Sequence, residues 1–132
     1  MQVKSPPLQS ISADVLGCEK DRLSLSPMAN ENGVMQVQSN AVVIQCDGLY
    51  LISLRGFFFH NVSIDIHYRN SSAPIQALRR ERRADFTTVV HMAYKDAVHL
   101  GVKSQDGACE QLQMNGGKLF LIQLRSDRYC AP

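Results

Sequence analysis

The sequence predicts an all-β sandwich built from two antiparallel sheets. Short runs rich in β-branched and aromatic residues recur along the chain, and turn signals such as Glu31-Asn32-Gly33, Asp47-Gly48 and Asn115-Gly116-Gly117 separate them. No window places an apolar face at helical spacing between a helix start signal and a stop signal. Many short strands without helices are typical of two packed antiparallel sheets.

The strand pattern covers nearly the whole chain of 132 residues, which is the length of one domain. We place that domain at residues 8–132 and interpret residues 1–7 as the remnant of a membrane-proximal stalk. The expected strands are Leu8–Asp14, Arg22–Ser26, Val34–Gln38, Ala41–Gln45, Gly48–Phe59, Val62–Arg69, Ile75–Leu78, Phe86–Tyr94, Ala97–Lys103 and Lys118–Arg125.

Composition excludes several classes of function. The formal net charge is only +2, whereas nucleic-acid-binding domains usually have a strongly basic face. The sequence contains no stretch of about 20 apolar residues, the length that crosses a bilayer as a helix. The first seven residues lack the apolar segment of a signal peptide. The cysteines and sequons described next nevertheless lead us to expect that the chain is the ectodomain of a longer protein.

The four cysteines, Cys18, Cys46, Cys109 and Cys130, indicate an oxidising compartment. Their number is even and their spacing is wide. No pair forms a Cys-x-x-Cys motif, so a zinc site is disfavoured. Four cysteines allow three pairings, and the sequence alone does not choose among them. Free thiols are the alternative interpretation.

Two N-glycosylation sequons occur, Asn61-Val62-Ser63 and Asn70-Ser71-Ser72. A single sequon is common by chance. Together with the cysteines, however, Asn61 and Asn70 favour a secretory route and an extracellular location for the domain.

The strands fall into two classes. Val62–Arg69 and Ala97–Lys103 alternate apolar and polar residues, as strands with one buried and one solvated face do. In contrast, Gly48–Phe59, Phe86–Tyr94 and Lys118–Arg125 carry apolar residues on both faces. A strand of this second class needs cover on both sides, and the sequence offers no helix to provide it.

Another copy of the protein is the remaining source of cover. We therefore predict that one face of the sheet containing these three strands forms the core and that the other packs against partner subunits, because a large exposed apolar patch is unusual on a solitary domain. Tyr50, Phe86 and Phe120 are the residues that we assign to this interface. The alternative is a locally thick core with a loop over the second face.

Three segments resemble the ligand domain of the tumour necrosis factor (TNF) superfamily, namely Val42–Gly56, Tyr94–Leu100 and Asn115–Ile122. The similarity runs from about Leu8 to Pro132. The resemblance implies a homotrimeric TNF-like jelly roll, displayed at the cell surface as a type II membrane protein or shed from it. It also implies that each groove between protomers binds a cysteine-rich receptor of the TNF-receptor family.

The resemblance also implies two disulfides, Cys46–Cys130 and Cys18–Cys109. The chain departs from the family pattern at Asn40. Because Ala41-Val42 follow this asparagine, the chain lacks a sequon that relatives often have in this region. Glycan positions are therefore taken from Asn61 and Asn70 alone.

Asn115 and Tyr129 are the expected receptor contacts, because both fall in segments matched to the family's receptor-facing lower rim. Tyrosine gives a large, rigid contact with a polar tip, a type that often dominates binding interfaces. The alternatives are structural: Tyr129 packs beside the Cys130 disulfide, and Asn115 is a turn residue ahead of Gly116-Gly117.

A basic run, Arg79-Arg80-Glu81-Arg82-Arg83, lies between two expected strands. We favour a solvated loop for it. The alternatives are contact with an acidic receptor or a heparan surface. Arg80 to Arg83 also fits the minimal pattern of a basic-residue protease site, although cleavage there would separate strands of one domain.

The histidines are not expected to bind a metal. If Lys95-Asp96 is the tip of a two-residue hairpin, His91 lies opposite Leu100 and His99 lies on the other face. We therefore predict no metal site and no cofactor.

Catalysis has little support in the sequence. Asp65 and His67 share one face of a strand, but no serine or cysteine in a nucleophile motif accompanies them. The function that the resemblance implies is that of a ligand, and we expect no enzyme. The alternatives are a complement C1q-like trimeric recognition head and a secreted jelly-roll lectin or enzyme.

Overall fold

The computed structural model describes residues 8–27, 35–70, 72–104, 109 and 112–130. The expected stalk at residues 1–7 and the start of the expected strand at Val34 lie outside these ranges. The described residues form eight strands: β1 (Ser10–Glu19), β2 (Arg22–Pro27), β3 (Gln36–Gln38), β4 (Ala41–Val43), β5 (Cys46–His67), β6 (Ile75–Met92), β7 (Ala97–Ser104) and β8 (Met114–Cys130).

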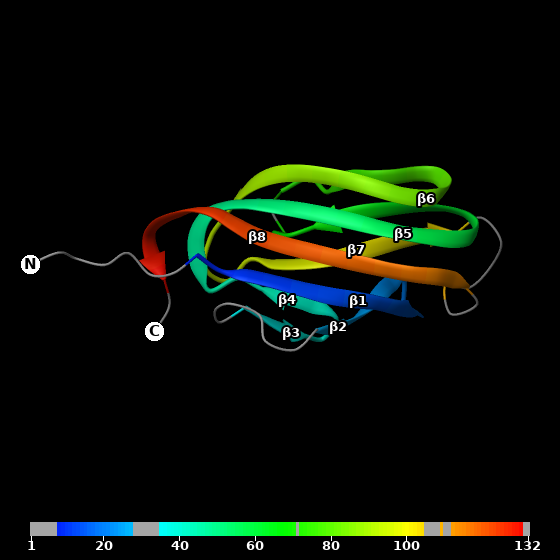
Figure 1. The fold of residues 1–132 in the computed structure, drawn as a ribbon, viewed down its shortest axis with the longest axis horizontal. Helices are drawn as coiled ribbons and strands as arrows, with labels where there is room; N and C mark the ends of the chain where they lie inside the picture. The colour runs from blue at the N-terminus through cyan, green and yellow to red at the C-terminus, as the bar shows by residue number, and fades with distance from the viewer. Residues whose placement is uncertain (1–7, 28–34, 71, 105–108, 110–111, 131–132) are drawn as a thin grey trace, which may run out of the picture.

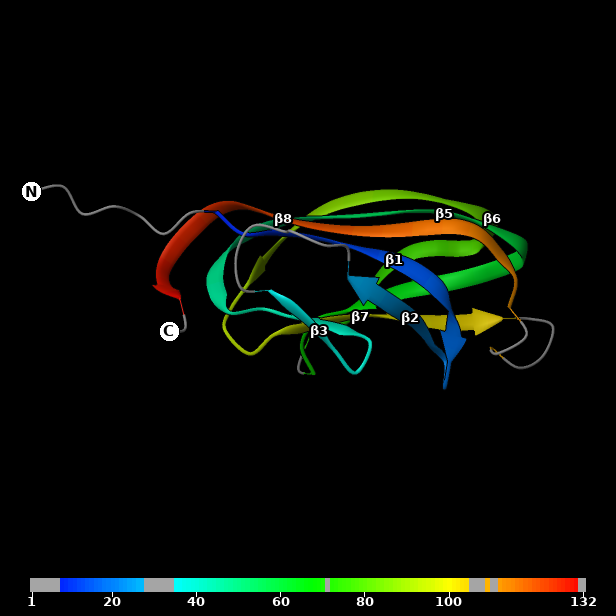
Figure 2. The same ribbon diagram turned by 60° about the horizontal axis from the view of Figure 1, so that its bottom comes forward.

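The strands build two antiparallel layers, which Figure 2 shows one above the other. The β8 sheet consists of β1, β8, residues 46–58 of β5 and residues 83–92 of β6. The β7 sheet consists of β3, β4, β7, residues 62–67 of β5 and residues 75–81 of β6. β2 pairs with β1 and touches β7 at one residue pair. This is the predicted jelly-roll sandwich.

The long strands β5 and β6 pass through both sheets (Figure 1). The sequence pattern divides each of them into two strands, and the register shifts between Phe57 and Val62, where the pair bends from one sheet to the other. The expected loop at Arg79–Arg83 is wrong, because this run lies within β6, where Glu81 pairs with Val62 and Arg83 pairs with Phe57. A run of charged residues is typical of a loop, and its place in a strand becomes apparent only from its pairing with β5.

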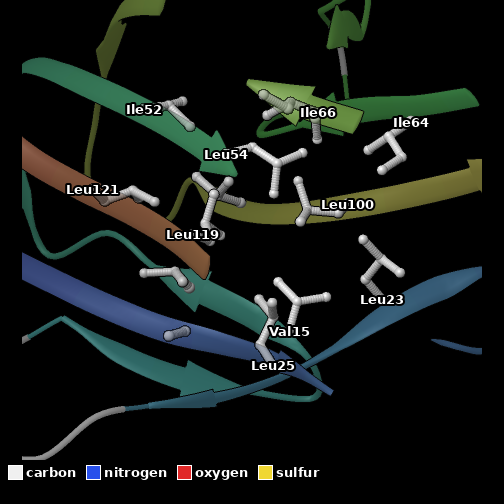
Figure 3. Close-up of a cluster of buried hydrophobic side chains, with 14 of the residues drawn as sticks. Val15, Leu23, Leu25, Ile52, Leu54, Ile64, Ile66, Leu100, Leu119 and Leu121 are labelled. Carbon is white, nitrogen blue, oxygen red and sulfur yellow. The ribbon is translucent and has the colours of Figure 1, made fainter. Parts of the chain in front are cut away.

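The core lies between the two layers (Figure 3). From the β8 sheet, Ile52, Leu54 and Leu121 point inward, and from the β7 sheet Ile66 and Leu100 meet them. All five side chains are at most 2% exposed. Burial of one such aliphatic side chain stabilises the fold by about 1.5 to 3 kcal/mol.

The expected hairpin between β6 and β7 is wrong. His91 pairs with Leu49 and His99 pairs with His67, so residues 83–92 of β6 and the strand β7 lie in different sheets. The residues that connect β6 to β7 hydrogen-bond to Ile44, which lies between β4 and β5, and they do not form a hairpin. The backbone of Ile44 donates to the carbonyl of Asp96 and accepts from the amide of Lys95. The turn at Lys95-Asp96 is therefore the place where the chain crosses from one sheet to the other.

Two disulfides tie the sandwich together, and they join the same pairs that the family resemblance implies. Cys18 near the end of β1 bonds to Cys109, and Cys46 at the start of β5 bonds to Cys130 at the end of β8. The second pair is separated by 84 residues. A cross-link over a loop of that length is worth about 4 to 5 kcal/mol in the chain-entropy model.

Candidate functional surfaces

The side of the β8 sheet that is turned away from the core is apolar. Leu51 pairs with Val89 on one side and with Ile122 on the other, so the three side chains form a row across three strands. Phe120 extends this row along β8. We call Leu51, Val89, Phe120 and Ile122 the apolar face. Val89 is 49% exposed and Ile122 is 42% exposed, so the chain's described residues leave this surface largely open.

A shallow hollow of about 400 Å³ lies within this apolar face, lined in part by Ser53, Thr87 and Phe120. The hydroxyl groups of Thr87 and Ser53 hydrogen-bond to each other at 3.1 Å across β6 and β5. Because they satisfy each other, they present little unmet polarity. The surface is therefore suited to apolar contact with another protein.

Only one of the three residues assigned to the subunit interface lies on this face. Phe120 does, whereas Tyr50 is fully buried on the core side and Phe86, paired with Leu54, packs against the core. The assignments of Tyr50 and Phe86 are therefore corrected. A strand that is apolar on both faces does not reveal which face turns inward, and tyrosine can be buried once its hydroxyl has a partner.

The partner of Tyr50 is the backbone. Its hydroxyl donates to the carbonyl oxygen of Cys46 at 2.6 Å, next to the disulfide. Burial, with a smaller contribution from the nearby carboxylate of Asp47, raises the pKa of Tyr50 to about 12. The phenol therefore stays neutral, and its hydrogen bond is preserved throughout the physiological pH range.

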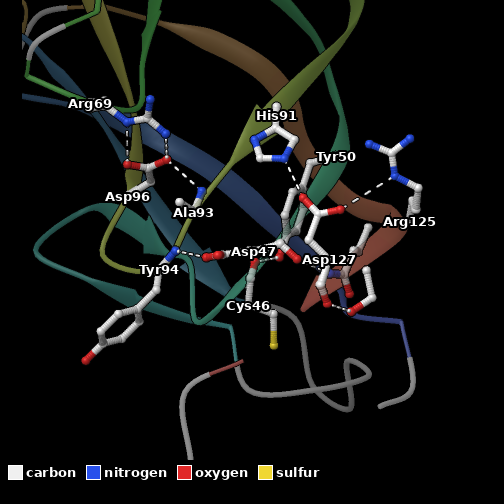
Figure 4. A network of polar contacts seen from close by, with 12 residues as sticks. Cys46, Asp47, Tyr50, Arg69, His91, Ala93, Tyr94, Asp96, Arg125 and Asp127 are labelled. Carbon is white, nitrogen blue, oxygen red and sulfur yellow. Dashed lines mark hydrogen bonds and ion pairs between the residues drawn. The ribbon is translucent and has the colours of Figure 1, made fainter. Parts of the chain in front are cut away.

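Two exposed tyrosines form a platform at the end of the sandwich that carries the Cys46–Cys130 disulfide. The rings of Tyr94 and Tyr129 are 5.5 Å apart, and the side chains are 39% and 46% exposed. The amide of Tyr94 donates to the carboxylate of Asp47 at 2.8 Å (Figure 4), and the Lys95 ammonium lies 5.6 Å from the Tyr94 ring. Tyr94 is not among the receptor contacts predicted from the sequence, because nothing near it in the chain indicates that Tyr129 is a neighbour.

Asn115 is far from this platform. It is exposed at the start of β8, whereas Tyr129 is near the end of the same strand. Fourteen residues of extended chain span roughly 45 Å. The expectation that Asn115 and Tyr129 share one rim of the molecule is therefore wrong, although both side chains are accessible.

Ion pairs support the turn and the strand ends around the tyrosine platform (Figure 4). Arg69 donates two hydrogen bonds to Asp96, at 2.9 and 2.6 Å, and Asp96 also accepts from the amide of Ala93 at 2.8 Å. The hydrogen bond to Asp96 raises the pKa of Arg69. On the β8 sheet, Asp127 lies 2.5 Å from the His91 imidazole and 3.7 Å from the Arg125 guanidinium.

The histidines His67 and His99 stack on the solvent side of the β7 sheet, with ring centres 4.6 Å apart and planes almost parallel. Burial, and then the charges of Arg22 and His67, lower the pKa of His99 to about 4. The pair lines a polar hollow of about 670 Å³ together with Arg22, Arg69 and other residues. Among the residues that the structure describes, no group of three or more metal-ligand side chains exists.

Both predicted glycosylation residues, Asn61 and Asn70, have exposed side chains. Ser71 of the second sequon lies outside the described residues. Modification of either asparagine stays a prediction. Within the described ranges we find no helix with the length and hydropathy of a membrane span.

Comparison with known proteins assigns the family. No family model matches the chain. Three curated proteins do match, all named tumor necrosis factor ligand superfamily member 4: the rat protein is 46% identical over 98% of this chain, the rabbit protein 39% over all of it and the human protein 34% over 95%. The chain belongs to the TNF ligand superfamily. It spans 66% of the length of the rat relative, 73% of the rabbit and 68% of the human one.

Solved structures agree with the TNF-like fold. Murine APRIL superposes with a TM-score of 0.68 at 12% identity, covering 89% of this chain and all of that one. The globular domain of zebrafish complement 1qA superposes with a TM-score of 0.67 at 11% identity, covering 92% of this chain and all of that one. The fold is common to both, so the sequence relatives, and not the architecture, place this chain among the TNF ligands.

Proposed function

We propose that this chain is the receptor-binding domain of a homotrimeric cell-surface ligand, a type II single-pass membrane protein that can also be shed. It binds and clusters a cysteine-rich receptor of the TNF-receptor family. By its resemblance to OX-forty ligand, the specific partner is the OX-forty receptor and the outcome is T-cell costimulation. This assignment follows the relatives named TNF ligand superfamily member 4.

The apolar face is the observation that carries this proposal. Val89 and Ile122 are nearly half exposed, and Leu51 and Phe120 lie between and beside them on the same surface. An apolar row on a disulfide-bonded domain favours contact with a second copy of the chain. Closed symmetry with three copies would cover every such face and leave three equivalent grooves.

The receptor contacts that we propose are Tyr129, its neighbour Tyr94 and Asn115. The two tyrosines offer adjoining aromatic surface at one end of the sandwich, and Asn115 lies at the other end. An elongated receptor lying along the molecule could meet both ends. Three grooves on one trimer would hold several receptors together, so that avidity adds to the affinity of each site.

Receptor binding by a Tyr129→Ala variant tests the proposed site. We expect an affinity loss of about thirtyfold, the size of a typical hot-spot truncation, with the trimer retained because Tyr129 is remote from the apolar face. Leu16→Ala is the matched control, since Leu16 is 67% exposed on β1. Surface plasmon resonance against the OX-forty receptor ectodomain measures both variants. Equal binding by both would remove Tyr129 from the site.

A C1q-like recognition head is the second candidate, because the zebrafish domain superposes almost as well as APRIL. A screen against cysteine-rich receptors of the TNF-receptor family separates the two. A trimer that binds none of them would favour the recognition head.

A further inference from the structure

The basic run carries all of the chain's net positive charge. Arg79, Arg80, Arg82 and Arg83 are four of 14 lysines and arginines, and Glu81 is one of 12 acids, so this run has a charge of +3 and the rest of the chain −1. All five side chains are exposed. Among the described residues, none of the four guanidinium groups forms an ion pair. An unneutralised cluster of this density attracts polyanions.

The run is held in a fixed geometry. Backbone pairing of Glu81 with Val62 and of Arg83 with Phe57 keeps it in β6, and the amide of Arg80 donates to the hydroxyl of Ser63 at 3.0 Å. The run spans the bend at which β6 passes from one sheet to the other, and β6 is an edge strand, so the side chains are reached from the open side. Because a protease needs a free extended substrate, strand pairing argues against cleavage at Arg83.

Aromatic surface adjoins these arginines. Phe57 and Phe59 are 43% and 48% exposed and meet edge to face, with ring centres 6.2 Å apart. Phe57 and Arg83 also line a hollow of about 430 Å³ with Arg55, whose guanidinium is 3.7 Å from Asp85. Guanidinium groups pair well with oxyanions, and aromatic rings supply apolar surface for sugar rings.

We propose that the run Arg79–Arg83, with Phe57 and Phe59 beside it, binds a sulfated polysaccharide of the extracellular matrix or cell surface. The run pairs with β5 where that strand bends, between Phe57 and Val62. This bend lies at the opposite end of the sandwich from Cys46, and β1 begins and β8 terminates at the Cys46 end (Figure 1). If the chain is anchored through the segment that precedes β1, as in the proposed function, the bend faces away from its own membrane. A linear polyanion is suited to an exposed strand edge, because its binding depends more on the density of positive charge than on the shape of a cavity.

Heparin chromatography with two equally charged double variants tests this proposal. Arg82→Gln/Arg83→Gln and Arg22→Gln/Lys95→Gln each remove two charges, but only the first pair lies in the run. We expect the first variant to bind heparin roughly tenfold more weakly, with a shallower salt dependence, as loss of two oxyanion contacts predicts. The second variant should elute close to the parent protein. Arg82→Lys/Arg83→Lys should retain binding, which separates charge from folding.

The competing outcomes are distinct. Equal elution of the two Gln variants would show that net charge alone governs retention and would overturn the proposal. Stronger binding to phosphatidylserine vesicles than to heparin, or unchanged binding to fully desulfated heparin, would overturn it as well. Receptor affinity is measured separately, so failure of this proposal leaves the receptor-binding proposal intact, and the reverse is also true.

Discussion

Asp96 organises the crossing between the sheets with a single side chain. It is 7% exposed and accepts hydrogen bonds from Arg69 and from the amide of Ala93. Replacing it with alanine leaves a guanidinium and a backbone donor without their partner, so we expect a loss of about 2 to 3 kcal/mol in unfolding free energy. Urea denaturation measures this loss. A cost below that of the exposed pair variant Asp85→Ala would contradict the assignment.

Tyr50 gives a second prediction at the residue scale. Tyr50→Phe keeps the buried ring but removes the hydrogen bond to the carbonyl of Cys46. We expect a loss of about 1 kcal/mol. The raised pKa adds a pH effect: stability from the neutral phenol is complete below pH 10 and declines as the pH rises from there toward 12. Alkaline denaturation that is identical in parent and variant would contradict the burial of this hydroxyl.

The environment of His99 predicts that the folded domain loses stability in acid. Its lowered pKa of about 4 means that the folded state resists a proton that the unfolded state accepts near pH 6.5. The resulting stability is complete above pH 6.5 and is lost as the pH falls toward 4. His99→Gln should flatten the stability profile in this window, and NMR titration of His99 should report the low pKa directly. An imidazole that titrates near 6.5 would contradict the stacked, partly buried geometry.

At the scale of elements, the sequence pattern predicted strand positions better than strand pairing. The alternation in Val62–Arg69 correctly separated Ile64 and Ile66 from Asp65 and His67, because one buried face imposes a period of two. The predicted hairpin of β6 with β7 was wrong. Adjacent strands joined by a short turn usually form a hairpin, and only long-range contacts reveal that the chain crosses between the sheets here. Tyr50 was misplaced because its strand is apolar on both sides.

Close approach of β5 and β8 explains one glycine and yields a test at this scale. A Cβ at Gly48 would lie too close to the carbonyl oxygen of Arg125, a backbone atom that cannot move aside. A Cβ at Gly17 would meet nothing within 4 Å. We expect Gly48→Ala to cost about 2 to 3 kcal/mol by overpacking and Gly17→Ala to be nearly neutral. Equal thermal stability of the two variants would contradict the register of β5 against β8.

At the scale of the whole molecule, the two predicted receptor residues show that a sequence does not reveal which residues are neighbours in space. Asn115 and Tyr129 belong to one strand, yet its length puts them at opposite ends. The neighbour of Tyr129 is Tyr94, which is 35 positions away along the sequence and is brought near by folding. The apolar content of the β8 sheet, in contrast, was visible in the sequence because three strands carried it.

The apolar face predicts how the assembly can be broken. Ile122→Asp places a carboxylate in the row formed by Leu51, Val89 and Ile122, so we expect subunits to separate while the domain stays folded, because its core lies on the other side of the sheet. Leu16→Asp is the control, since Leu16 is exposed on β1. Analytical ultracentrifugation distinguishes the two variants. A trimer that survives Ile122→Asp would place the interface elsewhere.

The mass of the protein in solution tests the central claim most directly. Because the exposed row on the β8 sheet requires cover, the chain of 14.7 kDa should sediment at three times that mass at micromolar concentration. A species of 14.7 kDa under the same conditions would mean that the row stays exposed to solvent, and it would contradict the account of this domain as the trimeric head of a TNF ligand.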